Sequence, residues 1–167
     1  MSKTSTDAVR HTLNGPTMGS RWTAVFYAAP GLHREPLQMA LQTTVDQVDA
    51  QMSTWRDDSE LMRLNQIPVG MWCPTSPELL HVLTLGLAVG RTTRGAFDIG
   101  MGDATQAWGF GRHPADAQRI RLALQAQRRP AYELLEISGQ QVRKTGPITL
   151  DLNGIAKGYG VDRLAEV

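Results

Sequence analysis

The residues best suited to chemistry lie at 149–162, where an apolar run meets a glycine-rich turn in the sequence TLDLNGIAKGYGVD. Gly154 leaves the backbone open at the turn, and Lys157 can bring a positive charge beside it. A helix that starts after the turn would direct its unpaired N–H groups towards an anion. The residue order matches neither a P-loop nor the GxGxxG loop of a dinucleotide-binding fold. The segment therefore predicts a phosphate site of neither standard type.

A second glycine-rich segment, residues 95–111, contains GAFDIGMG and WGFG. Its length and its aromatic side chains indicate an ordered, functional loop. Two interpretations of Asp98 stay open from the residues alone. The carboxylate either caps a turn or a helix, or it accepts a hydrogen bond from a sugar hydroxyl or ring N–H of a ligand that the glycines allow to approach closely.

Two shorter segments are ambiguous when each is taken alone. Residues 15–20, GPTMGS, form a turn before the first predicted strand, and this turn fits a flexible lead-in as well as a ligand contact. Residues 52–60, MSTWRDDSE, put Trp55 between two predicted helices. Its ring either packs in the core or offers a flat surface on which a heteroaromatic ring stacks, and these residues by themselves favour packing.

The elements that must position these segments alternate between strand and helix. Alternating side chains predict a strand at 20–29, and apolar residues at three- and four-residue steps predict an amphipathic helix from 36 to 52. A capping box at 57–60 predicts a short helix that ends near Asn65. Ser-Pro-Glu at 76–78 predicts the start of a buried helix that ends at about 91 or 92.

The second half of the chain predicts one more helix and three strands. The helix is expected at 114–129, and the strands at 132–138, 141–144 and 148–152. The first two of these strands are separated by a short glycine-containing turn, so we expect them to form a hairpin.

Composition limits the class of protein. The 167 residues are 41% apolar and 20% charged, which predicts one globular core rather than disorder. Seventeen basic and sixteen acidic residues provide no strong field for nucleic acid or anionic lipid. Cys73 is the single cysteine, so we expect no internal disulfide or zinc site and interpret it as a small buried residue.

The N-terminal residues indicate where the domain begins. Residues 1–10 lack the apolar run of a secretory signal, and no later stretch is long enough to span a membrane. We therefore expect a flexible arm at 1–14, a domain at 15–167 and a soluble, cytoplasmic protein. The alternative is a periplasmic lipoprotein whose leader is absent from this sequence.

Taken together and in order, four segments resemble the ApbE-type FAD:protein FMN transferases. Residues 15–20 are similar to the family's G-x-x-M-G-T/S turn, and residues 52–65 to its M-S-T-Y/W and S-E-L-x-R-L-N block. Residues 95–111 are similar to its G-A-F-D and W-G-F-G block. Residues 151–162 are similar to its D-L-x-G-I-A-K-G-Y block with a following Asp. The resemblance covers nearly all of the chain, from residue 15 to residue 167.

The resemblance implies an α+β domain with a mixed or antiparallel sheet flanked by helices. It implies a flavin transferase that, with magnesium, moves FMN from FAD onto a Ser or Thr of an acceptor flavoprotein and releases AMP. It raises ring stacking above packing for Trp55. Positions that match the family's contacts with FAD are Met18, Trp55, Ala96, Phe97, Asp98, Asn153 and Tyr159, with Lys157 close by. Ala156 matches the position whose backbone carbonyl binds the metal.

The chain also departs from the family pattern. Family members are about twice as long, and their later half carries the Asp and Thr side chains that hold magnesium and a His-containing segment near the acceptor. We therefore expect the N-terminal, FAD-binding half of such a transferase and assign no catalytic residue. Two alternatives are a module that holds or delivers FAD without transferring FMN, and an interaction domain that lost the site. Two copies pairing through Ile155, Val161 and Leu164 is a further possibility.

Overall fold

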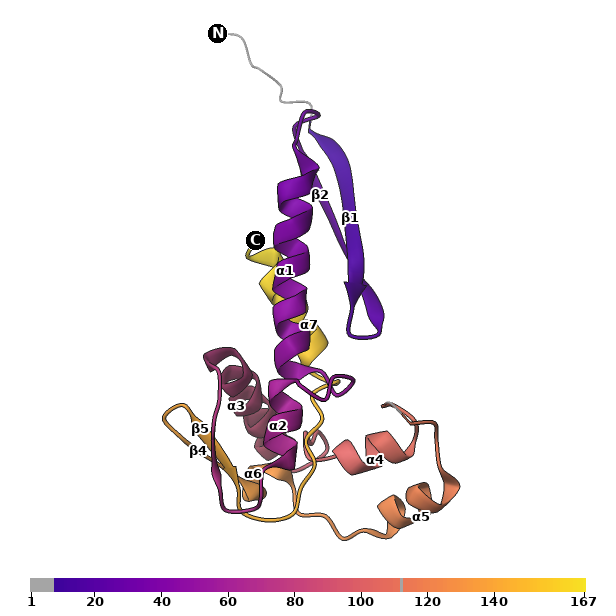
Figure 1. Ribbon diagram of the computed structural model, residues 1–167, viewed down its shortest axis with the longest axis vertical. Coiled ribbons are helices and arrows are strands. Elements are labelled where there is room, and N and C mark those ends of the chain that lie inside the picture. Colours follow the sequence, from indigo (N-terminus) through magenta and orange to yellow (C-terminus); the bar gives the residue numbers. More distant parts are fainter. Residues whose placement is uncertain (1–7, 112) are drawn as a thin grey trace.

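The structure is a computed structural model that describes residues 8–111 and 113–167. It has a narrow upper part, formed by a hairpin, the longest helix and the last helix, and a broader lower part that holds the remaining elements (Figure 1). Helices and small antiparallel sheets are combined in one chain, which confirms the predicted α+β class.

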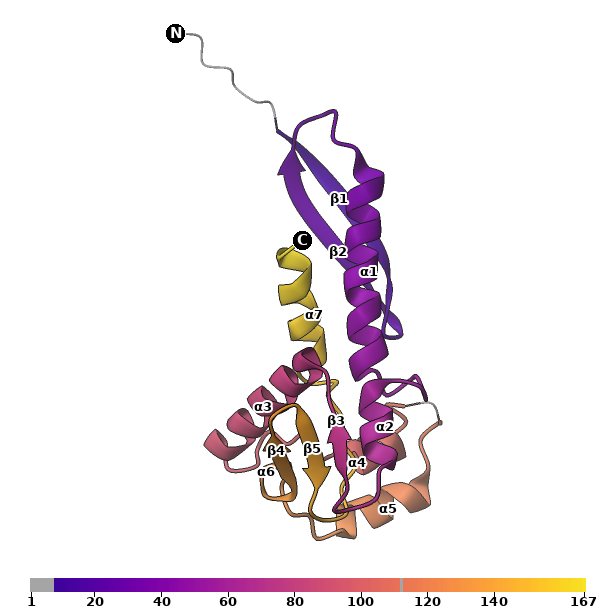
Figure 2. The ribbon, with the colours of Figure 1, turned by 60° about the vertical axis from the view of Figure 1, so that its left-hand side comes forward.

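The upper part is built around a two-stranded antiparallel hairpin, β1 (Val9–Thr17) and β2 (Ser20–Ala28). The long helix α1 (Arg34–Met52) contacts β1. The last helix, α7 (Ala156–Ala165), packs along α1, as the turned view also shows (Figure 2). Apolar side chains of the hairpin and α1 form a small buried cluster of Leu13, Trp22, Leu41 and Val45. The predicted strand at 20–29 and helix at 36–52 are therefore confirmed.

The lower part surrounds a three-stranded antiparallel sheet in the order β3-β5-β4. The hairpin of β4 and β5 confirms the predicted pairing, and Gly139 adopts a positive φ of 56° in its turn. The elements of this part are α2 (Glu60–Gln66), β3 (Trp72–Pro74), α3 (Pro77–Thr92), α4 (Gly102–Ala107), α5 (Ala117–Gln125), α6 (Ala131–Leu134), β4 (Leu135–Ser138) and β5 (Gln141–Lys144).

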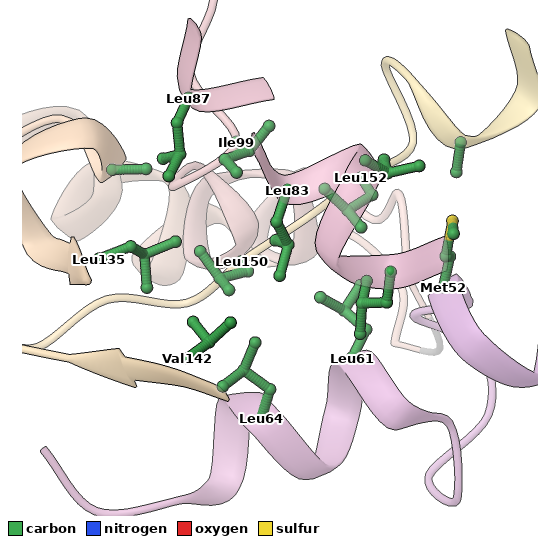
Figure 3. Close-up of a cluster of buried hydrophobic side chains, with 14 of the residues drawn as sticks. Met52, Leu61, Leu64, Leu83, Leu87, Ile99, Leu135, Val142, Leu150 and Leu152 are labelled. Carbon is green, nitrogen blue, oxygen red and sulfur yellow. The ribbon is translucent and has the colours of Figure 1, made fainter. Parts of the chain in front are cut away.

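The main core joins α2, α3, α6 and the strands β3, β4 and β5 to residues 150–156 (Figure 3). Leu61 of α2, Leu83 of α3 and Leu150 are each 0% exposed. Each such leucine stabilises the fold by about 1.5–3 kcal/mol relative to an exposed one. The same core therefore fixes the backbone on which the glycine-rich turn at 153–155 is mounted.

Two serine caps define where the helices of this core begin. Ser59 Oγ accepts from Met62 N at 3.1 Å and donates to Ser53 O at 2.6 Å. The predicted capping box was therefore displaced, because Ser59 and not Asp57 is the N-cap of α2. Ser76 caps α3 as predicted, and α3 ends at Thr92. These caps satisfy backbone N–H groups that would otherwise lack partners.

The predicted strand at 148–152 is wrong, because this segment forms only an isolated parallel bridge between Thr149 and Met101, although its backbone is held in place. Asn65 replaces a neighbouring strand: its Oδ1 accepts from Leu150 N at 2.7 Å, and its Nδ2 donates to Leu150 O at 2.9 Å. On the other side, Gly102 N donates to Thr149 O and Asp151 N donates to Ile99 O, both at 2.9 Å. The segment is thus bound by a side chain and a loop, so it belongs to neither sheet.

Three other predicted boundaries changed. The helix at 114–129 shortens to α5, because Asp116 is its N-cap and the backbone becomes extended at its C-cap, Ala126. The strand at 132–138 begins with the helical turn α6, which Pro130 precedes. Within the expected loop at 95–111 lies α4, and the three-residue strand β3 was not predicted because it is too short for an alternating pattern.

The predicted arm at 1–14 is only partly within the described chain, because residues 1–7 lie outside it. Residues 9–14 belong to β1, so for them the prediction of a flexible arm is wrong. Their backbone pairs with β2, for example Leu13 with Ala24. The sequence did not predict this strand because most of its residues are polar. His11 and Leu13 are buried and alternate with exposed residues, and this pattern is recognised only in the structure.

An apolar groove about 620 Å³ in volume runs between β2, α1 and α7. Val161, which is 64% exposed, and Leu164 are among its lining residues. Ile155 instead packs against the main core. Pairing of two copies through this surface stays a prediction.

Candidate functional site

Four of the predicted site residues meet around one hollow at the junction of the upper and lower parts. We call it the turn hollow; its volume is about 280 Å³. Its walls come from the β1–β2 turn, the α1–α2 connection, α4 with the loop after it, and the start of α7. The residues that line it are Met18, Gly19, Ser20, Trp55, Thr105, Phe110, Asn153 and Lys157.

The β1–β2 turn brings Met18 to the hollow through a tight two-residue loop. Met18 and Gly19 both have positive φ, 43° and 68°. This conformation matches the twist of a hairpin, but it is uncommon for a residue other than glycine. The predicted turn at 15–20 is therefore confirmed in a narrower form, since residues 15–17 belong to β1.

Trp55 is an exposed aromatic wall of the turn hollow. Its side chain is 44% exposed, whereas Met52 and Ser53 just before it are fully buried. Trp55 N donates to Ser53 Oγ at 3.0 Å, which fixes the backbone that carries the ring. The ring is thus partly covered and partly exposed at the hollow, and its stacking against a planar ligand stays a prediction. Phe110, 66% exposed, lines the same hollow and was not predicted as a site residue.

A buried carboxylate organises the floor of this hollow. Asp151 Oδ1 accepts from Asn153 N at 2.7 Å, and its Oδ2 accepts from Thr105 Oγ1 at 2.6 Å and from Asn153 Nδ2 at 3.1 Å. Asn153 Nδ2 also lies 3.5 Å from Thr54 Oγ1. Asp151 and Thr105 were not among the predicted site residues. Asp151 stood in a quoted motif, but nothing in the sequence indicated that Thr105 would reach it.

The start of α7 gives this region its electrostatic character. The helix begins at Ala156, so Asn153 and Lys157 lie at its positive end. Lys157 is exposed and lines the turn hollow. An ammonium group beside a helix N-terminus favours an anionic group such as a phosphate. Of the strand, turn and helix predicted at 149–162, the turn and the helix are present and the strand is not.

Asp98 and Ala96 lie at a second hollow, about 420 Å³ in volume, which includes Arg94 and Tyr132 in its lining. Asp98 Oδ1 accepts from Gly100 N at 2.8 Å and from Ala131 N at 3.0 Å. The capping interpretation of this carboxylate is therefore confirmed. The other carboxylate oxygen of Asp98, Oδ2, is the one to test for a hydrogen bond to a ligand.

Phe97 connects the two glycine-rich segments. Its ring packs against the main core, and its Cε2 would lie 3.2 Å from a Cβ added to Gly154. A larger residue at Gly154 would press on this ring, so the close approach is one reason for glycine at the turn. Phe97 therefore supports the backbone next to Asn153, whichever part of a ligand it also contacts.

A sequence profile described as the ApbE family matches residues 18–167. The chain belongs to the ApbE family. It is 33% identical over 162 residues to the FAD:protein FMN transferase of Klebsiella pneumoniae strain 342, with 93% of this chain and 46% of that protein covered. It is 34% identical over 163 residues to the FAD:protein FMN transferase of Vibrio cholerae strain O395, with 92% and 47% covered. The chain thus spans about half the length of these relatives.

Solved ApbE structures share the fold. The flavin transferase ApbE from Vibrio cholerae matches with a TM-score of 0.83 and 31% identity, over 95% of this chain and 53% of that one. The apo form of the Pseudomonas stutzeri flavinyl transferase ApbE matches with a TM-score of 0.79 and 29% identity, over 95% and 52%.

Three predicted residues of this ApbE-family chain lie outside both hollows, namely Phe97, Tyr159 and Ala156. Tyr159 faces His81 of α3, with ring centroids 6.1 Å apart, and burial raises the pKa of its hydroxyl. Ala156 is fully buried and lines a smaller cavity of about 130 Å³ together with Met18 and Lys157. The predicted set is therefore divided, with Met18, Trp55, Asn153 and Lys157 together and the other residues apart.

The metal contact predicted for the Ala156 carbonyl stays a prediction. Within 8–111 and 113–167, no three His, Cys, Asp or Glu side chains converge as ligands. The carboxylate of Asp151, which precedes the turn, accepts three hydrogen bonds. In the same part of the chain, no helix is long and apolar enough to cross a bilayer.

Proposed function

We propose that the protein acts as an FAD:protein FMN transferase, with this chain binding FAD. The observation that carries the proposal is the turn hollow, where Met18, Trp55, Asn153 and Lys157 meet from three segments far apart in sequence. An exposed aromatic ring, a polar amide and a positive charge beside a helix N-terminus suit a ligand with a ring system and phosphates. The names of the ApbE-family relatives support the same substrate.

A hollow of about 280 Å³ holds only part of an FAD molecule. We assign this part to the flavin end, because the exposed ring of Trp55 offers a surface for stacking. Asp98, Ala96 and Phe97 are proposed to contact FAD from the second hollow and its rim, and Tyr159 from α7. These contacts rest on the family resemblance.

The finer chemistry is also part of the proposal. FMN would be moved to a Ser or Thr hydroxyl of an acceptor flavoprotein, and AMP would be released. Magnesium, when bound, would neutralise charge on the pyrophosphate as its bond breaks. Ala156 would give its backbone carbonyl, and the carboxylate ligands would come from outside the described residues. The residues of this chain would bind FAD, orient its ring and hold its phosphates.

The test uses protein expressed from the complete reading frame. FAD is titrated while tryptophan fluorescence is followed, and we expect quenching with saturation. Magnesium and an acceptor protein are then added, and we expect AMP release together with a covalently flavinylated acceptor. Absence of FAD binding would refute the proposal. As a control, EDTA is added to remove magnesium. AMP release should then be abolished, whereas FAD binding at the turn hollow should still be measurable by tryptophan fluorescence.

A second candidate is a module that binds or delivers FAD without transferring FMN. It requires only the FAD contacts proposed for the turn hollow. Saturable FAD binding with no AMP and no labelled acceptor would identify this candidate. The compartment, cytoplasmic in the sequence prediction with a periplasmic lipoprotein as alternative, is tested by fractionating cells that express the complete reading frame.

A further inference from the structure

The Asn153 side chain is held in a defined orientation at the turn hollow. Its Nδ2 lies 3.1 Å from Asp151 Oδ2 and 3.5 Å from Thr54 Oγ1. Turning the amide over would bring its oxygen against the Asp151 carboxylate, where two acceptors repel each other. The Asp151 carboxylate therefore determines which position of the Asn153 amide holds the nitrogen and which holds the oxygen.

Asp151 is itself immobilised. It is 8% exposed, and its backbone N donates to Ile99 O at 2.9 Å. Thr105 Oγ1 of α4 binds the same oxygen that holds the Asn153 amide, at 2.6 Å. Upstream, the two bonds of Asn65 to Leu150 fix the adjacent backbone. The carboxylate cannot swing aside without breaking its hydrogen bonds to Thr105 and Asn153.

With its nitrogen committed, the Asn153 amide has its oxygen left for a ligand. Within residues 8–111 and 113–167, no hydrogen bond to Asn153 Oδ1 is formed. Asn153 is half-buried and lines the turn hollow with Trp55. The site therefore offers a hydrogen-bond acceptor next to an aromatic surface. Such a pair suits a flat ring that carries an N–H at its edge.

We propose that Asp151 is a positioning residue that orients the Asn153 amide, so that Asn153 Oδ1 accepts a hydrogen bond from the ring N–H of the FAD isoalloxazine. This inference rests on the proposed function and names the group that the turn hollow recognises. Oxidised isoalloxazine has one ring N–H, between two carbonyl groups. Methylation of that nitrogen removes the donor and adds bulk at the same point.

The test compares FAD with FAD methylated at this ring nitrogen, using protein from the complete reading frame. We expect the wild type to bind FAD about tenfold more tightly than the methylated analogue, the value of one hydrogen bond. In Asp151→Asn, the new amide nitrogen would face Asn153 Nδ2, so the Asn153 amide should turn over. We expect the discrimination to fall to within about twofold, with weaker FAD binding.

Asp116→Asn is the matched control. It makes the same substitution at a carboxylate that caps α5, and asparagine also caps helices well. Its discrimination should equal that of the wild type. Thermal unfolding of each variant shows whether it is folded, and a purely structural role of Asp151 would lower stability without changing the ratio of the two affinities.

The outcomes separate the two proposals. A wild type that binds both flavins equally refutes the Asn153 acceptor and leaves FAD binding intact. Discrimination retained in folded Asp151→Asn refutes the positioning role. A wild type that binds neither flavin refutes the proposed function and this inference with it. If Asp151→Asn does not fold, Asn153→Ala decides: tenfold discrimination that persists there overturns the proposal, and its loss supports it.

Discussion

Asp98 and Asp151 stand in two glycine-rich segments of this chain, and their carboxylates have different partners. Asp98 Oδ1 accepts from two backbone N–H groups, those of Gly100 and Ala131. Asp151 accepts from a threonine hydroxyl and from the backbone and side chain of Asn153. The first carboxylate joins its own loop to the start of α6, whereas the second organises a side chain that lines a hollow. The hydrogen-bond donors around an aspartate therefore indicate its role better than the motif in which it stands.

The two segments also support each other. Gly102 N donates to Thr149 O, and a Cβ on Gly102 would lie 2.8 Å from that oxygen. The Phe97 ring approaches Gly154 closely. The segment around Asp98 is thus a scaffold for the turn at 153–155, in addition to any contact of its own with a ligand.

The largest effect is expected at Asp98. Asp98→Ala leaves the N–H groups of Gly100 and Ala131 without their acceptor, and we expect the free energy of unfolding to fall by about 2 kcal/mol. Chemical denaturation measures this change. Asp98→Asn keeps an acceptor oxygen and should lose less than about 1 kcal/mol.

Asp98→Asn also tests the contrast with Asp151, because it changes the second oxygen to an amide nitrogen. Weaker FAD binding by this folded variant would show that Asp98 touches the ligand as well as the backbone. Unchanged binding would remove Asp98 from the FAD contacts and leave it a structural residue.

A smaller effect, confined to the ligand, is expected at Lys157. This side chain is exposed, so Lys157→Gln should hardly change stability. Loss of a charge-assisted bond to phosphate should weaken FAD binding about tenfold. Lys157→Arg, which keeps the charge, is the control. The tenfold loss should shrink at high salt, and an equal affinity of the wild type and Lys157→Gln at low salt would contradict the phosphate contact.

The smallest effect concerns Lys144, which supports the same backbone indirectly. Its Nζ donates to Asn65 O at 2.5 Å, and the residue is 5% exposed. Burial lowers the pKa of its ammonium group below the ordinary value of 10.5. Between the folded pKa and 10.5, the unfolded chain therefore binds more protons than the folded chain. The free energy of unfolding should increase as the pH rises across that window.

Lys144→Met lacks this group and should lack the increase. The measurement is the difference in free energy of unfolding between wild type and variant, taken at several pH values, which cancels the other groups that titrate there. A difference that does not vary with pH would show that the folded pKa of Lys144 is the ordinary one.

Most local elements were predictable because their signals are local. The strand at 20–29, the helix at 36–52, the cap at Ser76 and the hairpin around Gly139 follow from patterns within a few residues. The failed strand at 148–152 shows the limit. Its apolar alternation was real, since Leu150 and Leu152 are fully buried, but its partners are a side chain of α2 and a loop.

The sequence by itself determined the family, the α+β class and the four segments that hold the candidate residues, because these depend on residue types and their order along the chain. Only the tertiary structure decided which candidates meet. It brought Met18, Trp55, Asn153 and Lys157 to one hollow and left Asp98 at another. It also revealed Asp151 and Thr105 as partners 46 residues apart. Hydrogen bonds of this kind depend on distance in space, which packing sets and sequence separation does not.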